Sequence, residues 1–149
     1  MTRIPTAPLL LGLAGLIPFV WGAVTGLFPP LSDWGQSAFG ARYVGPFIQL
    51  SYGTVILSFM SGVLWGLAIR AEDGRRSLCL VLSVIPALWA FFMTGHGLAS
   101  DSINLICGFL AVLLIDFAYN RWDLTPDWWL PLRSFLTIIV VICIGVGTL

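Results

Sequence analysis

The stretch that decides the fold is SYGTVILSFMSGVLWG, residues 51–66, at the centre of a longer apolar run. This run extends from Pro46 to Ile69 and contains no charged residue. A helix rises 1.5 Å per residue, so about 24 residues are enough to cross a hydrocarbon layer about 30 Å thick. The stretch therefore predicts a membrane-spanning helix.

Small side chains recur at every fourth position of this stretch, at Thr54, Ser58, Gly62 and Gly66. A spacing of four places side chains on one face of a helix. Transmembrane helices associate by close packing, which small residues allow. We therefore expect these four residues to form a helix-packing stripe, and we expect this helix to be the centre against which the others pack.

The composition of the whole chain agrees with a membrane protein. Of its 149 residues, 58% are hydrophobic and only 9% are charged, whereas a soluble domain carries about 25% charged residues. The length suits one domain, residues 1–149. Seven basic residues balance seven acidic ones, which argues against a nucleic-acid partner and leaves membrane lipids as the expected surroundings.

Four further apolar segments surround the central one. Pro18 and Pro86 lie inside two of them, and each removes a backbone hydrogen bond and should kink its helix. The connection after Pro30 is long enough to hold a short interfacial helix. The five expected transmembrane helices span about 7–28, 46–69, 78–94, 102–119 and 131–149.

The arginines predict how this five-helix bundle is oriented. Five spans place the two ends of the chain on opposite sides of the membrane. Only Arg42 falls on one side; the other side receives Arg3, Arg70, Arg75, Arg76, Arg121 and Arg133. Because positive residues gather in cytoplasmic loops, the sequence predicts an all-α, polytopic bundle with its N-terminus inside and its C-terminus outside.

Four stretches of the chain resemble a known family. They are LLLGLAGLIPFVWG at 9–22, YGTVILSFMSGVLWG at 52–66, SVIPALWAF at 83–91 and PDWWLPLRSFLT at 126–137. Together they resemble the small inner-membrane proteins grouped as domain of unknown function three-four-two-nine, a family with a mitochondrial transmembrane relative. The resemblance implies a bacterial inner membrane, or the mitochondrial inner membrane in a eukaryote. It implies no particular activity.

One acidic residue, Asp116, lies inside an apolar run. A charge at that depth is costly and marks a functional site by default. Asp116 also lies about one turn from the end of its helix, on the arginine-rich side. We expect it to pair with an arginine, first of all Arg133, in a structural contact that ties two helices together. The alternative is a proton-relay role for this pair.

No arrangement of residues predicts catalysis. His96 stands between two glycines in a loop without enough neighbouring ligands for a metal. The three cysteines lie in apolar segments and not at metal-ligand spacing. No serine or cysteine nucleophile has a matching base. The sequence therefore predicts a non-enzymatic protein without a metal or cofactor.

Two classes of function remain. With almost no mass outside the membrane and several small-residue faces, the chain suits an accessory, scaffold or assembly protein of a larger inner-membrane complex, such as a respiratory or other energy-transducing one. Its partners would then be other integral membrane proteins. The alternative is a small transporter or a lipid- or quinone-binding protein, because proline-broken helices with aromatic neighbours suit a lipophilic pocket.

Overall fold

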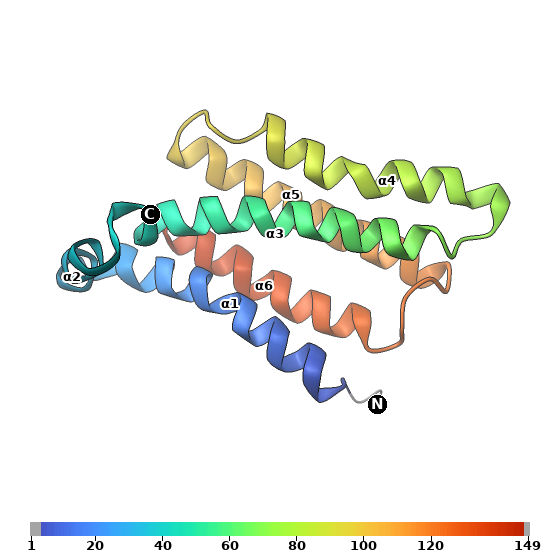
Figure 1. Ribbon diagram of the computed structural model, residues 1–149, viewed down its shortest axis with the longest axis horizontal. Helices are drawn as coiled ribbons and strands as arrows, with labels where there is room; N and C mark the ends of the chain where they lie inside the picture. The colour runs from blue at the N-terminus through green and yellow to red at the C-terminus, as the bar shows by residue number, and fades with distance from the viewer. Residues whose placement is uncertain (1–3, 148–149) are drawn as a thin grey trace.

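The computed structural model describes residues 4–147, and the described chain is built of helices joined by short connections. Five helices of the described chain are long and apolar enough to cross a membrane, which confirms the predicted all-α bundle with five membrane-spanning helices. They run antiparallel along the bundle (Figure 1). These five are α1 (Thr6–Leu27), α3 (Gly45–Ala68), α4 (Asp73–Phe92), α5 (Leu98–Arg121) and α6 (Trp129–Gly147).

Two of the helices begin four or five residues earlier than the apolar pattern predicts. Helix α4 begins at Asp73 rather than at residue 78, and α5 begins at Leu98 rather than at residue 102. The first turn of α4 is polar and contains an ion pair between Arg76 and Asp73 at 2.8 Å. Hydropathy locates the part of a helix that suits hydrocarbon, whereas backbone hydrogen bonding continues the helix into polar sequence.

The connection between α1 and α3 contains the short helix α2 (Pro29–Phe39) and a turn of 3₁₀ helix, η1 (Ala41–Tyr43). Two prolines open α2, where their missing N–H groups cost nothing. Gly40 then ends α2 with a φ of 96°, a conformation that favours glycine. Helix α2 lies beyond the end of α1 in Figure 1, in the connection where the sequence has room for an interfacial helix.

Helix α3 is central, as the sequence predicts, and it contacts α1, α4, α5 and α6. The small-residue stripe is not the surface that makes these contacts. Thr54 is half-buried, and Ser58, Gly62 and Gly66 are exposed on the outside of the chain. A Cβ atom added at Gly62 or Gly66 would meet nothing within 4 Å in the described part of the molecule.

The buried face of α3 instead combines larger side chains, including the fully buried Leu57 and Leu64, with small residues such as Gly53 and Ser61. The small residue at this contact is on the partner helix: a Cβ atom at Gly108 of α5 would lie 2.6 Å from Leu57 Cδ2. A leucine of one helix thus fits over a glycine of the next. Within the described chain, α3 therefore packs through the face of Gly53, Leu57 and Ser61 and not through the predicted stripe. A spacing of four residues fits both faces equally well, so the spacing alone does not identify the one that packs.

Both prolines singled out in the sequence lie within helices. Pro18 is inside α1 and Pro86 is inside α4, and each helix continues on both sides of its proline. The kinks expected at these positions remain a prediction.

One end of the bundle is held together by Gln49. Its amide nitrogen Nε2 donates to Phe19 O of α1 at 2.9 Å and to Cys143 O of α6 at 2.8 Å. The side chain of Gln49 is almost fully buried. Gly22 and Gly147 approach it so closely that a Cβ atom at either would collide with it. Three helices are therefore fixed to one another at this end.

Candidate functional site

The structure brings together Asp116 of α5 and Arg133 of α6, the pair that the sequence favours. Arg133 Nε lies 2.9 Å from Asp116 Oδ2. The other carboxylate oxygen, Oδ1, accepts a hydrogen bond of 2.8 Å from Trp129 Nε1. Asp116 is fully buried and Arg133 is 7% exposed. The carboxylate is therefore balanced in charge and hydrogen-bonded through both oxygens.

The local sequence explains this geometry. Trp129 and Arg133 are four residues apart on α6, so they lie on the same helix face. Asp116 lies near the end of α5, and α6 starts after a short connection, so the three side chains are at similar depth. Trp129 was not expected at this site from the sequence. Its spacing from Arg133 is the signal that identifies it as a second partner of Asp116.

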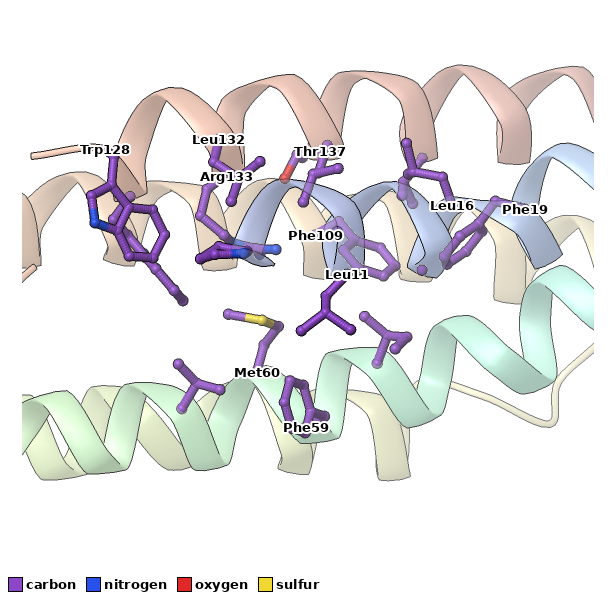
Figure 2. Close-up of a pocket in the computed structure, with 18 residues that line it drawn as sticks. Leu11, Leu16, Phe19, Phe59, Met60, Phe109, Trp128, Leu132, Arg133 and Thr137 are labelled. Atoms are coloured by element: carbon purple, nitrogen blue, oxygen red, sulfur yellow. The ribbon is translucent and has the colours of Figure 1, made fainter. Parts of the chain in front are cut away.

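Next to this ion pair is a cavity of about 340 Å³ between α1, α3 and α6. Its walls are almost entirely apolar. Figure 2 shows Phe19, Met60 and Phe109 on different sides of the space, with Trp128 at one end. A volume above about 300 Å³ and apolar walls are typical of pockets that hold small organic molecules.

Two polar side chains from α6 also line this pocket, Arg133 and Thr137. Figure 2 shows the Arg133 guanidinium reaching from α6 toward Met60, in the space between Trp128 and Phe109. Its Nη2 is buried and has no hydrogen-bond partner among the described residues. The Thr137 hydroxyl is also buried without a hydrogen-bond partner among the described residues. Buried polar groups are normally paired, so these two atoms need an explanation.

The pocket opens sideways, between α1 and α3. Leu11 of α1 and Phe59 of α3 both line it, and they are 74% and 64% exposed. Both residues lie within predicted membrane spans. In a membrane, the opening of the pocket would therefore face the acyl chains of the lipids.

The other residues singled out in the sequence lie elsewhere. None of Thr54, Ser58, Gly62 and Gly66 lines the pocket, and neither do Pro18 and Pro86. His96 is exposed in its loop, where its backbone N–H donates to Asp101. Among residues 4–147, no three His, Cys, Asp or Glu side chains come together. A lipophilic pocket was part of the alternative function considered from the sequence, but its position between α1, α3 and α6 and the role of Thr137 were not predicted.

Comparison with known proteins places the chain among membrane proteins of one family. Residues 4–149 match the family model described as Protein of unknown function (DUF3429). The chain belongs to this family. It is 34% identical to Transmembrane protein 69 of Xenopus tropicalis and 29% identical to Transmembrane protein 69 of Mus musculus.

These matches cover 97% and 93% of the chain and 54% of each relative, so the chain spans about half the length of the curated relatives it matches. No solved structure matches the chain.

Proposed function

We propose that this protein is a non-enzymatic membrane protein that binds a lipophilic, amphiphilic molecule in the pocket between α1, α3 and α6. The observation that carries the proposal is the combination of an apolar pocket open to the lipid layer with a buried, incompletely bonded guanidinium inside it. Apolar walls suit a hydrocarbon body, and a few convergent polar groups fix its orientation.

The ion pair supports binding more directly than it supports proton relay. A relay needs a carboxylate that can exchange protons with an aqueous path, whereas both oxygens of Asp116 already accept hydrogen bonds and the residue is fully buried. Asp116 instead holds Arg133 through Nε. The rest of the guanidinium is thereby positioned along the pocket, and the buried charge is balanced.

Two glycine-to-leucine variants test the proposal. Gly15 lines the pocket, and a Cβ atom there has only an ordinary contact, with Tyr52 Oη at 3.8 Å. Leucine at Gly15 should fill the pocket without a backbone collision. Gly62→Leu adds the same side chain to the exposed face of α3 and is the matched control. Purification in mild detergent, followed by solvent extraction and mass spectrometry, measures the retained amphiphile.

We expect wild type and Gly62→Leu to retain a specific amphiphile close to equimolar amounts, and Gly15→Leu to lose it. Equal retention by all three proteins would overturn the proposed binding site. A melting curve of each protein before extraction shows that Gly15→Leu is folded, so a loss of ligand is not a loss of structure.

A second function is favoured by a different observation. Ser58, Gly62 and Gly66 form an exposed face of small residues that no helix of the described chain covers. Such faces allow close association of membrane helices, which supports an accessory or scaffold role in a larger inner-membrane complex. The same variants separate the two functions. Gly62→Leu should lose a co-purifying membrane protein and keep the amphiphile, and Gly15→Leu should do the reverse.

We also propose that the pocket lies in the cytoplasmic half of an inner membrane, or in the matrix half in mitochondria. The support is the bias of arginines toward the end of the bundle that carries the α3–α4 turn and the start of α6. Substitution of Gly74 and His96 with cysteine tests this orientation. A membrane-impermeant maleimide should label His96→Cys in intact cells and Gly74→Cys only after permeabilisation; the opposite pattern would reverse the topology.

A further inference from the structure

The polar atoms of the pocket define what its occupant must offer. Arg133 Nη2 and Thr137 Oγ1 are the two buried side-chain atoms of the pocket lining that lack partners among the described residues. Arg133 and Thr137 are four residues apart on α6, so they lie on the same face of that helix. A guanidinium can only donate hydrogen bonds, and a hydroxyl can donate one. The occupant must therefore present a hydrogen-bond acceptor.

The charge count decides between an anionic and a neutral acceptor. Asp116 and Arg133 are an ion pair that already cancels in charge. Among the described residues, neither has another ion-pair partner. An anion beside Arg133 would leave one net negative charge among apolar side chains, which is costly in hydrocarbon. A neutral acceptor satisfies the same donors and leaves the site uncharged.

The dipole of α6 does not reverse this preference. The positive end of a helix favours an anion, but the effect is confined to the first turn. Helix α6 begins at Trp129, and Arg133 and Thr137 lie beyond its first turn. The cost of burying a net charge therefore outweighs the attraction of the helix end.

We propose that the pocket binds a molecule whose head is a neutral carbonyl, and that Arg133 Nη2 and Thr137 Oγ1 donate to that oxygen. The apolar body would lie against Phe59 and Met60 and leave through the opening beside Leu11. This inference rests on the proposed function and specifies its ligand class. The carbonyl can belong to an acyl ester of a lipid or to a quinone, since both join a neutral acceptor to an apolar body.

Four matched probes test whether the pocket prefers a neutral carbonyl to an anion or to a molecule without an acceptor. Brominated stearic acid carries an anion, its methyl ester carries a neutral carbonyl, and a brominated alkane of similar length carries no acceptor. The fourth probe is a short-tailed benzoquinone. Bromine and quinones quench tryptophan fluorescence, and Trp128 and Trp129 line the pocket. The measurement is made at about pH 9, where a carboxylic acid is ionised. Subtraction of the quenching in Gly15→Leu removes the contribution of probe dissolved in the detergent.

We expect the methyl ester to bind at least about tenfold more tightly than the ionised acid, because only the acid adds a buried charge. The ester should also bind more tightly than the alkane. Tighter binding of the ester than of the quinone would assign the site to lipid acyl esters, and the opposite order would assign it to quinones. Binding of the acid as tight as that of the ester would overturn the inference.

Thr137→Val removes one donor with little change of shape. Loss of one hydrogen bond should weaken binding of the ester about 2- to 10-fold and leave binding of the alkane unchanged. Because the hydroxyl has no hydrogen-bond partner among the described residues, the variant should be at least as stable as wild type. Unchanged ester binding would remove Thr137 from the site. If no probe shows quenching that depends on Gly15, the proposed function fails, whereas a preference for acid or alkane refutes only the carbonyl.

Discussion

The two ends of the bundle use buried polar side chains in different ways. At one end, both amide hydrogens of Gln49 are donated to helix carbonyls, and glycines close around the side chain, whose buried Oε1 has no hydrogen-bond partner among the described residues. At the other end, Arg133 uses Nε to hold Asp116 and leaves Nη2 without a partner beside an open pocket. The first arrangement fixes helices to one another. The second holds a donor in place for something that is not part of the chain.

Helix α1 shows the same contrast along its own length. Gly22 has no space for a side chain, since a Cβ atom there would lie 2.8 Å from Gly45 O and closer still to Gln49. Gly15, two turns earlier, lines the pocket, and a Cβ atom there would make only an ordinary van der Waals contact. A single apolar helix can thus be a packing element at one end and the wall of a binding site at the other.

The largest effect is expected from Asp116→Asn. It leaves the Arg133 charge buried without its counter-ion, and breaking a buried pair typically costs about 3–5 kcal/mol. Arg133→Gln should also destabilise the protein, and the double variant should cost less than the two single losses together. Chemical or thermal unfolding in detergent measures the loss of stability of the two single variants and of the double variant. Additive losses would mean that the pair is not the contact that holds this end of the bundle.

The next prediction compares the two faces of α3. Leu57→Ala should cost about 2–5 kcal/mol because it opens a cavity over Gly108. Gly62→Leu should change the stability of the isolated chain little, since the added side chain meets no neighbour in the described molecule. Unfolding midpoints of the two variants test this order. A larger loss for Gly62→Leu would restore the small-residue stripe as the internal packing face.

The smallest effects on stability are expected from alanine substitutions at two glycines of α1, one at each end of the bundle. Gly22→Ala should cost about 1–3 kcal/mol through overpacking, because the nearest atoms include a backbone carbonyl. Gly15→Ala should be neutral or stabilise the helix by up to about 1 kcal/mol, the usual preference for alanine over glycine. The two substitutions are chemically identical, so a similar effect on the unfolding midpoint would contradict the difference in packing between the ends.

The sequence predicts the number and positions of the membrane spans because hydrocarbon thickness is a strict requirement on helix length. It also favours the pairing of Asp116 with Arg133, because a lone carboxylate at that depth has few partners within reach. The packing face of α3 could not be obtained in this way. A repeat of small residues gives a spacing, but whether that face meets a helix depends on residues such as Gly108 on another helix.

The position of the pocket could not be predicted for a related reason. Its walls come from several helices, and each contributes residues such as Leu16 or Val140 that are ordinary in an apolar run. Only the polar residues of the pocket can be recognised in the sequence, because Trp129, Arg133 and Thr137 follow one another at intervals of four on α6. Such a row of polar or amphipathic side chains on a spanning helix indicates that this helix face does more than contact lipid.

The position of the opening beside Leu11 and Phe59 has a consequence for how any occupant reaches equilibrium. A molecule that enters from the acyl chains is counted by its mole fraction in the bilayer, not by its molarity in water. Diluting vesicles with buffer at a fixed ratio of ligand to lipid would leave the occupancy unchanged, whereas adding empty lipid would lower it. Exchange would then proceed by two-dimensional diffusion, and the thickness and order of the surrounding membrane would set its rate.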